Sequence, residues 1–262
     1  MTRTPATAPA DTDIAVVGIG ARFPDADDLA AFRANLAAGR DSVGDMPAAR
    51  ATATGLDPDA GYLPMGHLAD VHTFDHAFFG LSRREAALMD PQQRIALVLA
   101  HQAVEDAGHA ASALRGRQVA VVLSAAASGY LGAATEPGPL SALGNVPFAL
   151  PARIAHVLGF EGPCYAVDTG CNGSLVAVHQ ACRELRDGEA EYALAGGFSL
   201  RPGGLPARQT EGMTELVSPS GRCRAGGAHP PRHPPGAGGA RRPPTPVDLT
   251  TAATGENFRI AL

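Results

Sequence analysis

The sequence predicts an α/β domain with a layered, largely buried sheet. Short apolar runs of strand length alternate with amphipathic segments of helix length, the order expected when helices cover a mainly parallel sheet. With 262 residues, the chain is long enough to bury a substantial core. The predicted strands are 14–20, 118–123, 163–168 and 192–198, and the predicted helices are 27–38, 91–107, 152–158 and 172–187.

The first strand, residues 14–20, ends in Gly18-Ile19-Gly20, which is similar to the start of a dinucleotide-binding loop. The third glycine of that fingerprint would fall at position 23, which is Phe23, and Pro24 keeps a helix from opening directly. We therefore interpret this segment as a core strand that ends in a tight turn.

The next segments are a capped helix and a long excursion. Asp27 and Asp28 can cap a helix that Gly39 ends. Residues 40–72 are rich in Pro, Gly and Asp, so we interpret them as a surface excursion. The apolar side of the helix is predicted to consist of Leu29, Phe32 and Leu36. The aromatic residues after the excursion are predicted to pack in a core or an interface: Phe74, Phe78 and Phe79.

The central helix has Pro91 in its first turn and Gly108 after its end. His101 on this helix is interpreted as a structural residue. Pro151 starts the following short helix, and Gly159 ends it. The apolar stripe of the central helix is predicted to be Ile95, Val98, Leu99 and Ala103.

Composition excludes several classes of protein. The net charge of −5 and the absence of a basic stripe argue against nucleic-acid binding. No run of 18 apolar residues indicates a membrane span, and the Thr/Ala/Pro-rich residues 1–12 are predicted to be disordered rather than a signal peptide. The four cysteines form no CxxC pair, so we expect no metal site, no bound cofactor and a cytoplasmic chain with reduced thiols.

Cys171 is the candidate catalytic residue. The strand 163–168 enters a turn of Asp, Thr and Gly, and the helix 172–187 starts immediately after the cysteine. Unpaired N–H groups and the helix dipole favour a thiolate at such a corner. A thiolate without a positioned acid suits attack on a thioester better than attack on an amide. The backbone N–H of Cys171 is a natural oxyanion donor.

The residues around Cys171 leave alternatives open. Cys171 can also be read as a buried small hydrophobe, as we expect of Cys164 and Cys182. Asp168 and Thr169 are expected to bond the backbone of the turn. His179 is expected to be a packed core histidine, or one that supports a residue of the site from behind, rather than the base. The apolar stripe of this helix is predicted to be Leu175, Val178, Cys182 and Leu185.

Several motifs resemble those of β-ketoacyl synthases, especially the ketosynthase domains of modular type I polyketide synthases. The segment 167–179 is similar to their V-D-T-A-C-S-S-S-L-V-A-V-H signature, and it holds Cys171 at the nucleophile position. Residues 14–24 resemble their opening strand. Further blocks match in order: Phe78 to Ala86, Met89 to Arg94, Glu105 to Gly108, Arg153 to Ala155 with Gly162-Pro163, and Ser218 to Ala225.

The resemblance implies a thiolase-like layered fold for residues 13–225, as the N-terminal part of a ketosynthase. It implies that Cys171 accepts an acyl chain from the phosphopantetheine arm of an acyl carrier protein. Decarboxylation of a malonyl-type extender and a Claisen condensation would follow. It also implies a homodimer.

The sequence departs from the family in three places. Pro147-Phe148 and Pro151 disturb a segment that in the family usually carries Ser and Gly residues lining the acyl pocket. Gly170, Asn172 and Gly173 replace Ala, Ser and Ser, which suggests a looser corner. Residues 226–262 are a Pro/Gly/Arg-rich tail, predicted to be disordered, where the family continues with F-D-x-x-x-D-G and two active-site histidines.

We therefore expect a frameshift or truncation near position 226. The alternative to an active enzyme is a non-catalytic fragment that keeps at most carrier-protein or dimer contacts. A third possibility, a hydrolase or acyltransferase, would need only the thiol and a base such as His179.

Overall fold

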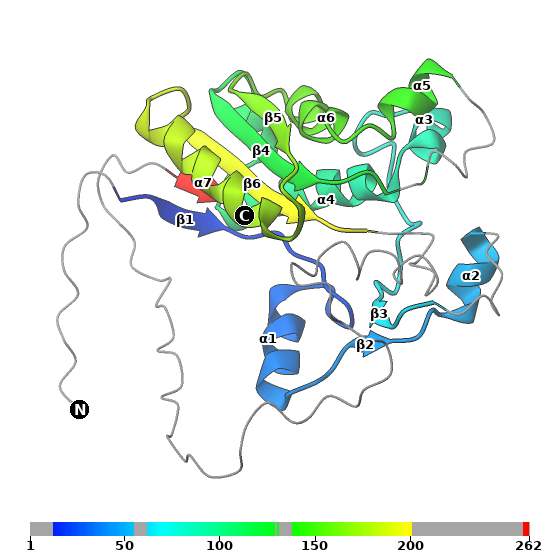
Figure 1. Cartoon of the computed structure of the whole chain (residues 1–262). Coiled ribbons are helices and arrows are strands. Elements are labelled where there is room, and N and C mark those ends of the chain that lie inside the picture. Colours follow the sequence, from blue (N-terminus) through cyan, green and yellow to red (C-terminus); the bar gives the residue numbers. More distant parts are fainter. Residues whose placement is uncertain (1–12, 55–61, 129, 131–137, 201–258, 262) are drawn as a thin grey trace, which may run out of the picture.

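The computed structural model describes residues 13–54, 62–128, 130, 138–200 and 259–261 (Figure 1). Within these ranges, none of the helices has the length and apolar character needed to cross a bilayer. The predictions for residues 1–12 and 226–258, and the motif Ser218 to Ala225, lie outside the described residues.

The strands are β1 Ala15–Gly18, β2 Val43–Gly44, β3 Met65–Gly66, β4 Val119–Ala125, β5 Cys164–Val167, β6 Tyr192–Phe198 and β7 Arg259–Ala261. The helices are α1 Leu29–Ala38, α2 Ala48–Thr54, α3 Arg83–Leu88, α4 Pro91–Asp106, α5 Pro139–Leu143, α6 Ala149–Leu158 and α7 Gly173–Arg186, with 3-10 turns η1 Ala111–Leu114 and η3 Gly170–Asn172.

Five strands form one sheet in the order β1-β7-β6-β4-β5, and every pair in it is parallel. β4 and β6 are paired along seven residues, from Val119 opposite Tyr192 to Ala125 opposite Phe198. The α/β prediction is confirmed. The prediction of a disordered tail is wrong at Arg259–Ala261, because these residues form β7 between β1 and β6.

Helices cover both faces of this sheet, with α7 on one face and α4 and α6 on the other (Figure 1). Alternate residues of β4 point to opposite faces, because a strand has a side-chain period of two. Val119, Val121 and Leu123 join the core with α4 and α6, whereas Ala120 and Val122 join the core with α7.

Several sequence signals for helix ends are confirmed, but the predicted start at Pro151 is wrong, because α6 begins at Ala149 and Pro151 lies in its first turn, where a missing N–H leaves no helical hydrogen bond unmade. The Asp28 side chain accepts the Ala31 N–H at 2.7 Å, and Gly39 ends α1 in the left-handed region at φ 64°. Pro91 occupies the first turn of α4. The predicted apolar side of α1 is wrong as a buried face, since α1 has no buried residue and Leu36 is exposed.

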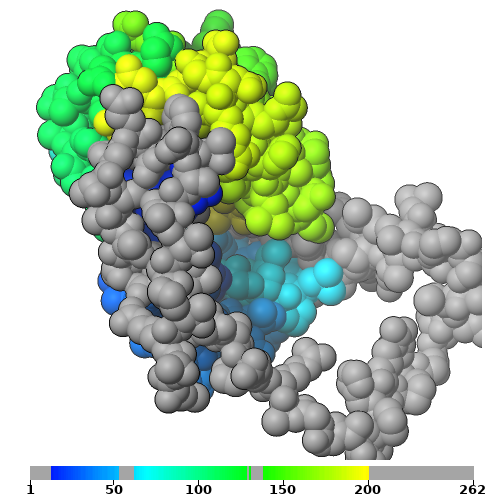
Figure 2. All heavy atoms as spheres, turned by 90° about the vertical axis from the view of Figure 1, so that its left-hand side faces the viewer, coloured from blue at the N-terminus to red at the C-terminus, as the bar shows by residue number. Residues whose placement is uncertain are grey.

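The Gly18-Ile19-Gly20 turn packs against α4, as expected of a core strand that ends in a tight turn. A Cβ on Gly18 would lie 2.2 Å from the Ala103 carbonyl oxygen. Asp106, the last residue of α4, accepts the Ile19 N–H at 2.9 Å. Below the sheet, α1, α2 and the antiparallel β2–β3 pair form a separate lobe, shown in blue and cyan in Figures 1 and 2.

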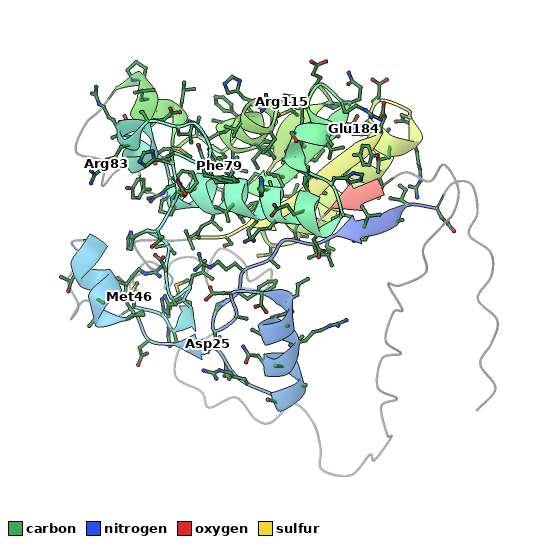
Figure 3. The ribbon with its side chains drawn as sticks, turned by 180° about the vertical axis from the view of Figure 1, so that it is seen from behind. Asp25, Met46, Phe79, Arg83, Arg115 and Glu184 are labelled. Atoms are coloured by element: carbon green, nitrogen blue, oxygen red, sulfur yellow. The ribbon has the colours of Figure 1, made fainter. Side chains whose placement is uncertain are left out.

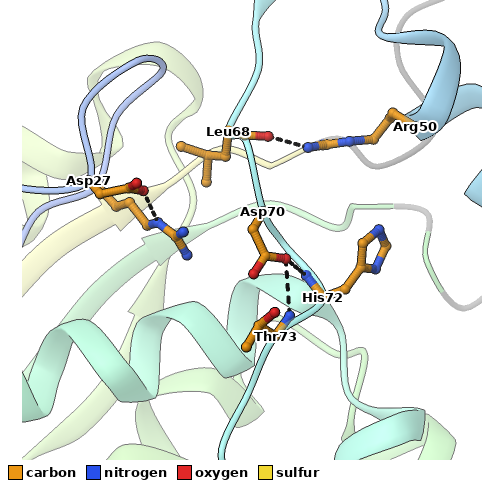
Figure 4. A network of polar contacts seen from close by, with 7 residues as sticks. Asp27, Arg50, Leu68, Asp70, His72 and Thr73 are labelled. Carbon is orange, nitrogen blue, oxygen red and sulfur yellow. Dashed lines mark hydrogen bonds and ion pairs between the residues drawn. The ribbon is translucent and has the colours of Figure 1, made fainter.

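Within residues 40–72 the lobe contains α2 and, on either side of it in the chain, the paired strands β2 and β3, none of which the sequence predicted. Polar contacts hold it together, as Figure 4 shows. The Arg50 guanidinium donates to the Leu68 carbonyl, and Arg22 pairs with Asp27. The Asp70 carboxylate accepts the backbone N–H groups of His72 at 2.7 Å and Thr73 at 3.1 Å.

The predicted aromatic cluster forms beside α4, where Figure 3 labels Phe79. The Phe74 and Phe79 rings stack with centroids 5.4 Å apart, and Phe78 meets Phe79 edge to face. His101 pairs with Glu105 at 3.3 Å and contacts Phe78, which agrees with a structural role for this histidine.

Candidate active site

Cys171 lies in the turn that joins the sheet to α7. β5 ends at Val167, the 3-10 turn Gly170–Asn172 holds the cysteine, and α7 begins at Gly173. The sequence places the helix start one residue earlier, at Asn172, which here is the N-cap of α7. The Cys171 residue is exposed, so the alternative of a buried structural cysteine is wrong.

The turn before Cys171 is shaped by its own side chains and by a glycine. The Asp168 carboxylate accepts the Gly170 N–H at 3.2 Å, as predicted for a turn-bonding aspartate. Gly170 has φ 67°, in the left-handed region that L side chains rarely adopt. Glycine at this position, where the family signature has alanine, therefore fits the observed backbone.

The first turn of α7 stands directly on the ends of two strands. A Cβ on Gly173 would lie 2.0 Å from the Ser124 Oγ of β4. A Cβ on Gly197 of β6 would lie 2.8 Å from the Ser174 Cβ. The sequence suggests that glycine loosens this corner, but the structure shows that Gly173 allows a close approach of helix and sheet.

The positive end of the α7 dipole faces the turn. Neither Thr169, the N-cap of η3, nor Asn172, the N-cap of α7, caps its helix with a side-chain hydrogen bond. The Gly173 N–H bonds the Gly170 carbonyl. Negative charge near this end of a helix is stabilised by the dipole and by backbone N–H groups that lack intrahelical partners.

His179 is exposed, so the expectation that it is a packed core histidine is wrong. Its position six residues after Gly173 also keeps it away from the first turn of α7. Among the described residues, no hydrogen bond or ion pair joins the Cys171 thiol to a histidine.

The other described cysteines differ from Cys171. Cys164, expected to be buried, is an exposed residue on β5, although desolvation of its thiol raises its pKa. Cys182 is half-buried on α7 and packs against the core on that face. Cys223 lies outside the described residues. The chain thus carries a second exposed cysteine in a regular strand.

A cavity of about 540 Å³ lies beside the first turn of α7. Ser174, Leu175 and Val178 form its α7 wall, and Cys171 is not among its lining residues. The other walls come from the loop after β1, from α4 and from the end of β6. Most of the lining is apolar, as is usual for pockets that hold alkyl groups. Leu175, expected to be buried, is 73% exposed at the rim.

The family model for the N-terminal domain of β-ketoacyl synthases matches residues 11–229. A phenolphthiocerol/phthiocerol polyketide synthase protein of Mycobacterium tuberculosis is 42% identical over 231 residues, which cover 81% of this chain and 14% of that protein. The 5-methylorsellinic acid synthase of Aspergillus terreus is 38% identical over 218 residues, covering 81% of this chain and 8% of that protein.

Solved structures show the same relation. The ketosynthase from module 6 of the bacillaene synthase of Bacillus subtilis aligns with a TM-score of 0.65 and 33% identity, covering 79% of this chain and 35% of that one. A Streptomyces albus oxazolomycin ketosynthase domain aligns with a TM-score of 0.62 and 35% identity, over 71% and 34% of the two chains. The chain therefore spans about a third of these ketosynthases and a smaller share of the polyketide synthases.

Proposed function

The chain belongs to the β-ketoacyl synthase family, and from this premise we propose that Cys171 is its acyl-accepting nucleophile. The family has the thiolase-like layered fold that the resemblance implies. The observation that carries the proposal is the exposed position of Cys171 at the strand-to-helix corner, at the positive end of α7. The apolar cavity beside Ser174 and Leu175 supports it, because an acyl chain needs an apolar environment.

The proposed step is transfer of an acyl group between two sulfurs. The Cys171 thiol loses its proton to water, and its sulfur attacks the carbonyl carbon of a thioester on the phosphopantetheine arm of an acyl carrier protein. The backbone N–H of Cys171 donates to the oxygen of the tetrahedral intermediate. The bond from that carbon to the pantetheine sulfur then breaks, and the departing thiolate takes up a proton.

We restrict the proposal to acyl loading. Decarboxylation and condensation, which the resemblance implies, need imidazole groups next to the nucleophile, and no described histidine is bonded to Cys171. The alternative is a non-catalytic ketosynthase fragment. The lack of a described histidine bonded to Cys171 supports this alternative too. Without an acid or base partner, an acyl group on Cys171 would not go on to condensation.

Intact-mass measurement after incubation with an acyl-carrier thioester tests acyl loading. We expect one acyl group per chain in the wild type and in Cys164→Ala, and none in Cys171→Ala. Cys164 is the matched control because it is exposed and lies on the strand that leads to the same turn. An unmodified wild-type chain, under conditions that load a complete ketosynthase, would favour the non-catalytic alternative.

We also propose that the chain forms a homodimer through the outer edge of β5. β5 is the last strand of the sheet and pairs with β4 on one side among the described residues. Such an edge is a template for pairing with another chain. Sedimentation should show a dimer, and Ala166→Pro, which removes an N–H on the outer side of β5, should convert it to a monomer. A wild-type monomer at micromolar concentration would contradict the proposal.

A further inference from the structure

Gln92 of α4 joins the carboxyl ends of two neighbouring strands. The side chain is only 4% exposed. Its Nε2 donates to the Ala126 carbonyl at 3.1 Å, and its Oε1 accepts the Leu200 N–H at 3.3 Å. Ala126 directly follows β4, and Leu200 lies two residues after β6. One buried amide therefore spans the two strand ends.

The first turn of α7 stands on the same strand ends from the opposite face. Gly173 packs on Ser124 of β4, and Ser174 packs on Gly197 of β6. Neither Gly173 nor Gly197 has room for a Cβ, so α7 and the two strands are in close contact there, and a strand residue that moves toward α7 would push against its first turn. A shift of either strand end is therefore transmitted to the turn that holds Cys171.

We propose that Gln92 is a positioning residue that holds together the two segments leaving β4 and β6, just beyond the last paired residues Ala125 and Phe198, and that through Gly173 and Ser174 it fixes the position of Cys171. The consequence for acyl loading rests on the proposed function, whereas the consequence for the geometry of the turn does not. A displacement of about 1 Å at a reacting group can slow a reaction by about 100-fold.

Gln93 is a matched control on the same helix. It is 3% exposed, its Nε2 donates to the Leu143 carbonyl at 3.0 Å, and its Oε1 accepts from the Arg153 Nε at 2.9 Å. Both glutamines thus bury one amide, which makes two hydrogen bonds in Gln93 and three in Gln92, whose Nε2 also donates to the Asp90 carboxylate at 3.5 Å. They differ in what they join, because Gln93 contacts α5 and α6 rather than the strand ends.

The test compares Gln92→Met with Gln93→Met in the full chain. Three properties are measured: hydrogen exchange of the Leu200 amide, alkylation of Cys171 by iodoacetamide relative to Cys164, and acyl loading from a carrier thioester. We expect Gln92→Met alone to speed Leu200 exchange, to change the Cys171 to Cys164 alkylation ratio more than twofold, and to slow loading about tenfold. Gln93→Met should leave all three within twofold of wild type.

Equal effects of the two variants on Cys171, or an unchanged alkylation ratio in Gln92→Met, would overturn the proposal. If Gln92→Met does not fold, Gln92→Asn keeps the amide but is one methylene too short to reach both strand ends, and the same readouts apply. If the wild type is not acylated at all, the proposed function fails, while exchange and alkylation still decide the role of Gln92.

Discussion

The two faces of the sheet are built from side chains of different size. The face covered by α4 and α6 buries large aliphatic and aromatic groups such as Leu97, Ile154 and Phe160. The face covered by α7 buries six alanines among its eight fully buried members. Large groups bury more apolar area for each residue, so the first face contributes more to stability. Small groups let α7 approach the sheet closely, so the second face positions Cys171.

The comparison predicts that shortening a side chain is most harmful on the α4 and α6 face. Leu97 is fully buried in that core, so Leu97→Ala should lower the free energy of unfolding by about 3 kcal/mol through lost burial and a residual cavity. Urea unfolding followed by circular dichroism measures it. Leu36→Ala on exposed α1 is the control and should change stability by less than about 0.5 kcal/mol. Similar losses for both variants would show that the core is not concentrated on this face.

On the α7 face the harmful change is the addition of a group. Gly173→Ala places a Cβ 2.0 Å from the Ser124 Oγ, and we expect a loss of about 2 kcal/mol from overpacking. Ser124→Gly removes the obstructing atoms, so the double variant should recover at least half of that loss. A double-mutant cycle in urea checks this, and purely additive losses would mean that the two residues do not clash.

The lobe below the sheet differs from both faces because its stability depends on polar groups. The Thr73 side chain and the His72 N–H, helped by the Thr73 N–H and Arg22, lower the pKa of Asp70 from 3.8 to about 2 against opposing desolvation. A lowered pKa in the folded state stabilises it above the unfolded pKa. This contribution, at most about 2 kcal/mol, is lost as the pH falls from about 4 to about 2.

The variant Asp70→Asn isolates this contribution. It should be less stable than wild type at pH 7, and the difference should shrink at pH 2.5, as measured by urea unfolding at both pH values. A difference that is the same at both pH values would mean that the carboxylate charge of Asp70 does not contribute.

Local sequence signals predicted much of the main sheet and its helices, since a cap such as Asp28 or a stop such as Gly159 acts within a few residues. Contacts between distant segments were not predictable. The close approach of Gly173 to Ser124 depends on strand order, and so does the exposure of Cys164 on the edge strand.

Apolar periodicity was a poor guide to the buried side of α7. It selected Leu175, but Ala177 and Ala181 are buried instead, because close packing favours small side chains. The two-residue strands β2 and β3 are too short to show a period.

The smallest predicted effect comes from the glycine that precedes Cys171. Comparing it with a second glycine distinguishes a loss of stability from a change in the shape of the Cys171 turn. Gly170 and Gly188 have φ values of 67° and 77°, and a Cβ on either would meet nothing within 4 Å. Gly170→Ala and Gly188→Ala should each cost about 1 kcal/mol, because both strain a left-handed backbone without a steric clash. Gly170 adjoins Cys171, whereas Gly188 follows the other end of α7. Only Gly170→Ala should therefore change the rate of Cys171 alkylation at equal loss of stability. An equal change in both variants would show that overall stability, rather than the shape of the turn, controls access to the thiol.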